Sequence, residues 1–356
     1  MNPAETSPGL RRPALDPAEI TTTVNAACRI LGLDPRGHAV LKFTNNAVLR
    51  LPHAGVVVRI AGSAAVGERA QRVVQVARLL ERHGVPAVRL AQPDDQPMLV
   101  RGHEVTVWHD VRPVREATPE DLAVLLKAFH AVPMAAPAAP VVPARRGRSR
   151  RSPSVPGQNT GPIPVQPGPA SGASGACGAS LSLVRWEPVA GIRRRIASAG
   201  PLPAGDLAFL QAETDAVAED LVALNGVEPM LAPGLIHGDS FLGNIIVAED
   251  GPVLCDFDST CWGPREWDLT PIAVGALRFD YGGDLASRFA AAYGQDVLSW
   301  PGFPALRRLR ELQLVTSVLP VLAANPGLQP QWRFRVDSLR RGDAGARWST
   351  YGQVAV

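Results

Sequence analysis

The sequence predicts an α+β protein built from two lobes or domains. The chain has 356 residues, of which 46% are hydrophobic, and this composition can supply two separate cores. Most of the short strand-like runs lie before residue 110, and helical patterns dominate the remainder. We therefore expect a first part that contains a sheet and a second part that is mainly helical.

The first predicted element is a helix that begins at Pro17, after a polar, Pro-rich stretch over residues 1–17 that we expect to be a flexible tail. Gly32 can end this helix. Its apolar residues fall on one face, as in an amphipathic helix. These residues are Ile20, Val24, Ala27, Cys28 and Leu31.

Strands follow this helix. Two runs, 39–43 and 47–51, are separated by Thr-Asn-Asn, whose composition favours a tight turn. A third strand over 56–60 is apolar except for Arg59, and a helix is expected over about 66–82 with Gly84 as its cap. Further short strands are predicted at 85–90, 98–100 and 105–108.

The second part begins with a helix over residues 119–130, for which Thr118 is the N-cap. Residues 133–180 are mainly Pro, Ala, Gly and Ser, and we expect a disordered insertion because this segment buries too little apolar surface to fold. Its basic run at 145–151 favours a solvated linker, with binding to nucleic acid or an acidic surface as the alternative. Helices are predicted near 189–199, 206–224 and within 331–351.

Net charge, apolar runs and cysteine spacing indicate which partners and which cell compartment to expect. The net charge is +3, so neither nucleic acid nor a membrane surface is required as a partner. No apolar run is long enough to cross a bilayer, and the first residues lack the apolar core of a signal peptide. The cysteines lack metal-binding spacing, so we expect free thiols and a soluble, cytoplasmic protein. They are Cys28, Cys177, Cys255 and Cys261.

The most informative segment covers residues 235–258. An apolar run leads to His-Gly-Asp at 237–239, and Asn244 follows five residues after the Asp. A short apolar strand, an acidic turn and a second strand come next, and Asp-Phe-Asp at 256–258 follows the second strand. The pattern predicts a hairpin with polar side chains before its first strand and after its second.

This layout fits phosphoryl transfer. Mg²⁺ prefers hard oxygen ligands and keeps several waters, so two protein ligands can hold it against a triphosphate. A further carboxylate has to face the acceptor hydroxyl. Protein kinases provide these groups with His-Arg-Asp-x-x-x-x-Asn and Asp-Phe-Gly, and the same spacing occurs here with Gly238 in place of Arg. An isolated Asp-x-x-x-x-Asn turn is usually structural, but this combination favours a catalytic site.

The two motifs together resemble the aminoglycoside phosphotransferase and choline kinase superfamily, which has a protein-kinase-like fold. The resemblance implies a bilobal fold. A small antiparallel-sheet N-lobe over residues 18–110 would bind the nucleotide. A larger, mainly helical C-lobe over residues 111–356 would provide catalysis and the substrate site.

The same resemblance implies roles for particular residues. Asp239 would be the catalytic base, and Asn244 and Asp256 would hold the metal. His237 would brace the catalytic loop. Asp268 lies in a Gly-Pro-Arg-Glu-Trp-Asp-Leu segment that is also similar to the family, and it would tether that loop through hydrogen bonds.

In the N-lobe, relatives usually carry a Lys on the third strand that is paired with a Glu on the helix. Arg59 is the positional match, and its charge suits phosphate although its planar group differs from Lys. Glu68 is the candidate partner, with capping of the helix start as the alternative. Asn45 is expected in the loop that meets phosphate oxygens, with a plain turn as the alternative. Trp108 and His109 begin the expected hinge, residues 108–111, where adenine would lie, with core packing as the alternative for Trp108.

Two other charged residues lie close to these positions in the sequence. Asp258 is expected to cap or support the loop that carries Asp256 rather than to bind the metal. Lys42 is expected to be solvated on an early strand.

We therefore expect a Mg²⁺-dependent phosphotransferase that moves the γ-phosphate of ATP or GTP to a hydroxyl of a small molecule. A catalytically weak, nucleotide-binding regulatory protein on the same fold is the alternative, and a protein kinase is disfavoured by Gly238. The acceptor stays open, because a cationic acceptor would require a carboxylate-rich cleft. The candidate carboxylates are Asp280, Asp284, Glu311, Asp337 and Asp343.

Overall fold

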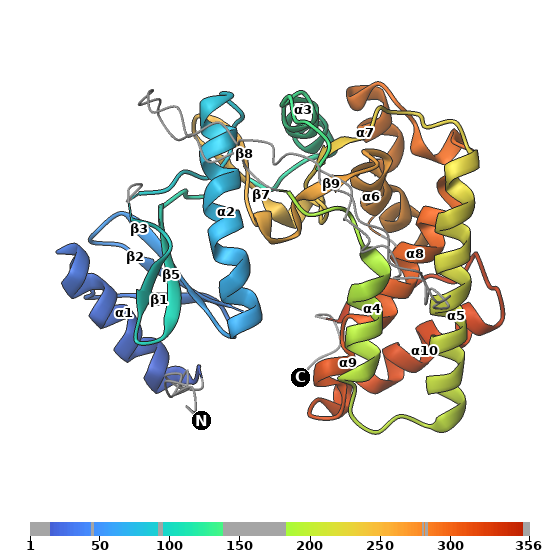
Figure 1. Ribbon diagram of the computed structural model, residues 1–356, viewed down its shortest axis with the longest axis horizontal. Coiled ribbons are helices and arrows are strands. Elements are labelled where there is room, and N and C mark those ends of the chain that lie inside the picture. The colour runs from blue at the N-terminus through green and yellow to red at the C-terminus, as the bar shows by residue number, and fades with distance from the viewer. Residues whose placement is uncertain are drawn as a thin grey trace, which may run out of the picture.

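A computed structural model describes residues 15–43, 46–91, 95–137, 183–279, 281 and 284–351. Two lobes lie side by side, with the chain start in the smaller lobe and the chain end in the larger one (Figure 1). This arrangement confirms the predicted α+β fold with two lobes. Most of the predicted tail and of the predicted insertion lies outside the described residues.

The small lobe is an antiparallel five-stranded sheet of order β1-β2-β3-β5-β4 with two helices. Side chains alternate between the two faces of each strand, so Val58 enters the core beside α1 while Arg59 points to the opposite face, toward the other lobe. The elements are α1 (Pro17–Leu31), β1 (Ala39–Phe43), β2 (Asn46–Leu51), β3 (Val56–Ala61), α2 (Ala64–Arg82), β4 (Met98–Val100) and β5 (His103–His109).

The larger lobe is mainly helical and contains two short antiparallel strand pairs, β6 with β9 and β7 with β8. In it α3 packs on α7, and α8 packs on α4, α5 and α6. The strands are β6 (Gly234–Ile236), β7 (Ile245–Ala248), β8 (Gly251–Leu254) and β9 (Cys261–Gly263). The helices are α3 (Pro119–His130), α4 (Pro188–Ala197), α5 (Ala204–Ala223), α6 (Glu266–Arg278), α7 (Leu285–Tyr293), α8 (Phe303–Thr316), α9 (Leu319–Leu322) and α10 (Gln329–Arg340).

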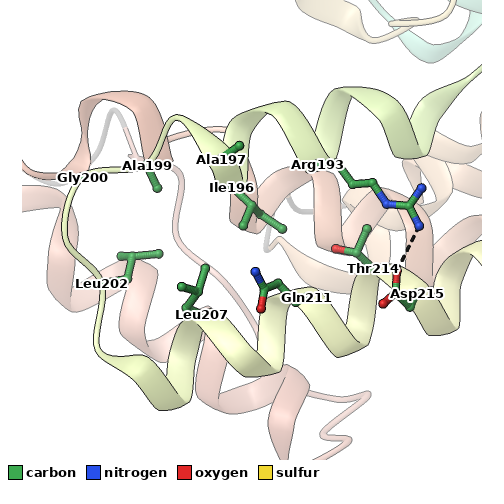
Figure 2. A pocket seen from close by; sticks show the side chains of 10 residues that line it. All are labelled: Arg193, Ile196, Ala197, Ala199, Gly200, Leu202, Leu207, Gln211, Thr214 and Asp215. Atoms are coloured by element: carbon green, nitrogen blue, oxygen red, sulfur yellow. Dashed lines mark hydrogen bonds and ion pairs between the residues drawn. The ribbon is translucent and has the colours of Figure 1, made fainter.

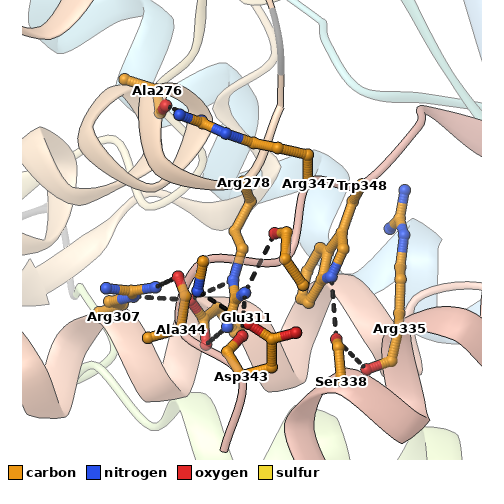
Figure 3. A network of polar contacts seen from close by, with 12 residues as sticks. Ala276, Arg278, Arg307, Glu311, Arg335, Ser338, Asp343, Ala344, Arg347 and Trp348 are labelled. Carbon is orange, nitrogen blue, oxygen red and sulfur yellow. Dashed lines mark hydrogen bonds and ion pairs between the residues drawn. The ribbon is translucent and has the colours of Figure 1, made fainter.

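A buried arginine ties the C-terminal segment to this lobe (Figure 3). Arg278 of α6 donates to both carboxylate oxygens of Glu311 on α8, at 2.7 and 2.9 Å. It also donates to the carbonyl oxygens of Asp343 and Ala346, at 2.7 and 3.2 Å. A buried charge is costly unless it is paired and hydrogen-bonded, and these contacts satisfy that requirement for Arg278.

Residues 85–90 do not form the predicted strand. They make isolated bridges at Ala87 and Leu90, because Pro86 has no N–H to donate to a ladder. The segment joins the two lobes instead. The N–H of Val88 donates to the carbonyl oxygen of Leu254 on β8 at 2.9 Å, and Leu254 donates back to Pro86 at 3.1 Å.

The length and the apolar content of the described helices indicate whether any of them could cross a membrane. None of them combines the length and the apolar content that a membrane-crossing helix requires.

Candidate active site

Asp268 organises the loop that carries Asp239. Its carboxylate accepts from the backbone N–H of His237 at 2.6 Å and from that of Gly238 at 2.8 Å. Burial alone would raise the pKa of Asp268, but other groups have the opposite effect. The hydrogen bond and charge of His130, the charge of His237 and the N–H of Gly238 outweigh burial and hold this pKa below its usual value. The position of the loop is therefore fixed by a buried, charged acceptor.

His130, at the end of α3, completes this contact and was missed by the sequence analysis. One ring nitrogen lies 3.0 Å from Oδ2 of Asp268, and the other lies 2.7 Å from the hydroxyl of Tyr293. The sequence contains one weak signal for it, since a polar residue occupies a helix position that should be buried.

Gly238 has to be glycine for two reasons. Its φ is +83°, which L-residues rarely adopt. A Cβ at this position would also collide with the backbone carbonyl of Ser259. The carbonyl of Gly238 accepts from the indole of Trp267 at 3.0 Å. The tight loop explains why Gly stands where protein kinases have Arg.

His237 connects the same loop to the end of β8. Its Nε2 lies 3.0 Å from the carbonyl oxygen of Cys255, and its ring packs against Phe129 and Phe257. The position matches the expected bracing of the loop, and the role stays a prediction.

Asp239 presents its carboxylate at the surface of the site, where the side chain is 42% exposed. Its backbone carbonyl accepts from Nδ2 of Asn244 at 2.8 Å. Arg310 of α8 forms an ion pair with the Asp239 carboxylate at 3.2 Å. Sequence analysis missed Arg310, which lies 71 positions further along the chain.

A cavity of about 480 Å³ lies between the lobes and is lined by residues of both. Asn244 and Asp256 line it from the larger lobe, and Lys42, Arg59 and Trp108 line it from the smaller lobe. Lys42 is not simply solvated, because its Nζ lies 3.6 Å from Oδ2 of Asp256. The cavity thus combines apolar walls with carboxylate, amide and cationic groups.

Asp256 provides the carboxylate that lines this cavity. Burial works against its charged form. Hydrogen bonding with Asp258 and the positive charges of Arg59 and Lys42 outweigh burial and hold the pKa of Asp256 below its usual value. Its φ is +67°, an unusual conformation for a residue other than Gly or Asn and one that often marks a functional position.

The oxygens of Asn244 and Asp256 fit a magnesium ion. Both are hard ligands at one edge of the cavity, and the Asn244 amide uses its nitrogen for the contact to Asp239. Its oxygen has no hydrogen-bond donor among the described residues. Two such oxygens would be enough for the protein to hold the ion beside the phosphates of a nucleotide.

Arg59 pairs with Asp258 rather than with Glu68. Its Nη2 donates to Oδ2 of Asp258, and the Asn46 amide oxygen, once oriented to satisfy both groups, accepts from Arg59 Nε at 3.2 Å. Ala70 and Val73 of α2 line the space beside Arg59.

Glu68 precedes Ala70 by two residues, and this places it about 200° away around the helix. It is exposed and makes no ion pair with the residues that the structure describes. The expected pairing of Arg59 with the helix glutamate is therefore not formed, because α2 turns Glu68 toward solvent.

The hinge residues line the same cavity. Trp108 is buried and its indole donates to the Thr106 hydroxyl at 2.9 Å, so most of its ring belongs to the core. The backbone N–H of His109 donates to Arg89 and that of Asp110 donates to Gly55. Within the described hinge, Val111 is the cavity residue whose N–H has no backbone acceptor. Asn45 lies outside the described residues.

A second cavity, of about 600 Å³, lies between α4 and α5 (Figure 2). It is larger than the cavity between the lobes, but it contains none of the predicted site residues. Its polar groups include Arg193 and Asp215, which pair with each other at 2.9 Å. The residues that the sequence analysis assigned to the metal and the phosphates, Asn244, Asp256 and Arg59, instead line the cavity between the lobes.

Comparison with known proteins agrees with this geometry. The sequence model of the phosphotransferase enzyme family (APH) matches residues 42–312. Comparison with proteins of curated function gives no match.

Several solved structures share the bilobal kinase-like fold. Choline kinase LicA from Streptococcus pneumoniae has a TM-score of 0.58 and 13% identity, over 91% of this chain and 99% of that chain. Aminoglycoside phosphotransferase APH(3'')-Id from Streptomyces rimosus has a TM-score of 0.53 and 15% identity, over 83% and 98%. Amicoumacin kinase hAmiN, solved with AMP-PNP, Ca²⁺ and Ami, has a TM-score of 0.56 and 11% identity, over 96% and 100%.

Proposed function

Because the chain belongs to the phosphotransferase enzyme family, we propose that it transfers the γ-phosphate of ATP or GTP, with Mg²⁺, to a hydroxyl group of a small molecule. One observation carries the proposal. The cavity between the lobes combines Asn244 and Asp256 with Arg59 and Lys42, and Asn244 holds the backbone of Asp239 directly beside it.

In this proposal the nucleotide occupies the cavity between the lobes. The base lies between Val57, Trp108 and Ile245, which are apolar wall residues, and its edge accepts from the N–H of Val111. A solved kinase of the same fold contains AMP-PNP and Ca²⁺, and this supports the use of a nucleotide and a divalent cation. When bound, the magnesium nucleotide supplies the transferable phosphoryl group and neutralises part of its charge.

The residues of this chain then position the reactants. Asn244 and Asp256 hold the metal with their oxygens, and Arg59 and Lys42 offset phosphate charge. Asp239 accepts a hydrogen bond from the acceptor hydroxyl and takes its proton. Arg310 orients the Asp239 carboxylate through the ion pair between the two side chains. Catalysis therefore comes mainly from positioning and electrostatics.

Asp256→Asn should weaken nucleotide binding in the presence of Mg²⁺, by about 10- to 100-fold in Kd, because a charged ligand is lost. Without Mg²⁺ the same change should leave binding equal or tighter, since it removes a negative charge that faces the phosphates. Calorimetric titration of a non-hydrolysable ATP analogue, with and without Mg²⁺, measures both.

The matched control is Asp250→Asn, which neutralises an exposed carboxylate in the turn of the same hairpin. It should leave both Kd values unchanged. An identical Mg²⁺ dependence in wild type and Asp256→Asn would remove Asp256 from the metal site.

A further inference from the structure

The charge around Asp239 bears on the acceptor, and this inference rests on the proposed function. Three arginines lie close together on α8. Arg307 and Arg308 are bound by structural carboxylates of the larger lobe. Arg310 differs from them, because its carboxylate partner is Asp239.

Arg310 is well placed to bind a second anion. Its Nη1 contacts Asp239 at 3.2 Å and the amide oxygen of Gln313 at 3.5 Å. A guanidinium has five N–H donors, and Nε and Nη2 of Arg310 have no acceptor among the described residues. The side chain is 15% exposed, so it is partly buried beside the proposed base.

Arg195 is a second cation, on α4, a helix that packs on α8. Arg193 faces the cavity toward α5 (Figure 2), so Arg195, about 200° further around the helix, points to the opposite side. Burial lowers the pKa of Arg195, the charge of Asp239 raises it, and the charges of Arg310, Arg194 and Arg69 lower it further. Arg195 is half-buried and forms no ion pair with any carboxylate in the described part of the chain.

The carboxylates that a cationic acceptor would need are used elsewhere. Glu311 binds Arg278 and Arg307 in the buried network of Figure 3. Asp337 pairs with Arg340, and Asp343 accepts from the backbone of Gly345.

Two candidate carboxylates remain, Asp284 and Asp280. Asp284 precedes α7 and lies near Arg288, which pairs with Glu120. Asp280 lies outside the described residues. None of the four candidate carboxylates that the structure describes contacts Asp239, whereas Arg310 does.

We propose that the acceptor is an anionic hydroxy compound, such as a sugar phosphate or a hydroxy acid, whose oxyanion is bound by Arg195 and Arg310 while its hydroxyl faces Asp239. An anionic acceptor brings its charge close to the triphosphate, and two guanidinium groups lower that repulsion. In the transfer, the hydroxyl oxygen forms a bond to the γ-phosphorus. The bond from that phosphorus to the bridging β-γ oxygen breaks, its electron pair leaves with the nucleoside diphosphate, and the hydroxyl proton passes to Asp239.

The test uses matched acceptors that differ in charge. Transfer from ATP is measured with glucose, glucose 6-phosphate, gluconate and a cationic aminoglycoside, for wild type, Arg195→Gln and the control Arg193→Gln. The phosphate and carboxylate members distinguish the two sources of the oxyanion. Arg193 is exposed, lies on the same helix and pairs with Asp215, so its replacement should change no kinetic constant.

The expected result is a higher kcat/KM for an anionic acceptor than for its neutral match. In Arg195→Gln the KM for that acceptor should rise by about 10- to 100-fold, because hydrogen bonds to a charged group are lost. The KM for ATP should stay unchanged. A neutral or cationic acceptor that reacts best, or a change confined to the KM for ATP, would overturn the inference; the latter would place Arg195 on the nucleotide.

A binding measurement tests the same anion site without requiring turnover. Inorganic phosphate is titrated calorimetrically into wild type and Arg195→Gln, both with and without a magnesium complex of AMP-PNP. Weaker phosphate binding in the variant supports the inference, and equal or absent binding in both proteins refutes it. Failure to bind any nucleotide would instead count against the proposed phosphotransferase, so the two failures are distinguishable.

Discussion

Asp239→Asn is expected to lower kcat by about 10²- to 10⁴-fold, the usual contribution of a positioned general base. Asparagine has nearly the same shape, and the backbone carbonyl that accepts from Asn244 is unchanged, so the loop should keep its structure. The amide takes no proton from a hydroxyl at neutral pH. Nucleotide affinity should be unchanged, because Asp239 does not line the cavity between the lobes.

Steady-state rates and nucleotide titration together check this prediction. Asp215→Asn is the matched control, because Asp215 is an exposed carboxylate whose partner, Arg193, lies away from the cavity between the lobes. Wild-type turnover in Asp239→Asn would show that another group faces the acceptor hydroxyl. Lost nucleotide binding would show that the substitution disturbs more than the proton acceptor.

Asp268→Ala is expected to lower the free energy of unfolding by about 3–5 kcal/mol, as when one partner of a buried ion pair is removed. The change leaves two buried backbone N–H groups, of His237 and Gly238, without their acceptor. It also leaves His130 without its buried carboxylate. Activity should fall as well, because the loop that carries Asp239 loses its anchor.

Urea denaturation measures this loss of stability. The control is Asp337→Ala, which removes a partly exposed carboxylate paired with Arg340 and should cost about 0–1 kcal/mol, as for surface ion pairs. Equal stability losses in the two variants would mean that Asp268 does not hold the loop in the folded protein.

Local patterns in the sequence predicted much of the architecture. The apolar runs at 47–51 and 56–60 and the single apolar face of the first helix predicted β2, β3 and α1 at nearly their observed bounds. The strand predicted at 85–90 does not form, because Pro86 has no N–H for a strand ladder. The backbone of this segment is instead hydrogen-bonded to Leu254 of β8. An apolar run alone does not distinguish a strand from such a connecting segment.

The residues of the candidate site also fall into two groups, those that a local motif could predict and those that it could not. Asp239 and Asn244 are five residues apart, so one loop brings them together and a local motif could indicate both. The contact of His130 with Asp268 spans 138 positions, and that of Arg59 with Asp258 spans 199. Such contacts depend on how elements that are distant in the sequence pack together, and periodicity carries no information about them. For the same reason, the sequence offered Glu68 as a candidate partner of Arg59, with helix capping as the alternative, and did not indicate Asp258.

Transfer of labelled phosphate from γ-labelled ATP and GTP is the most direct test of the central claim. It is measured with and without Mg²⁺, against anionic, neutral and cationic hydroxyl compounds. We predict a phosphorylated small molecule that forms only with Mg²⁺ and is lost in Asp239→Asn. Tight nucleotide binding without labelled product from any of these acceptors would contradict the claim and favour a nucleotide-binding protein that has no transferase activity.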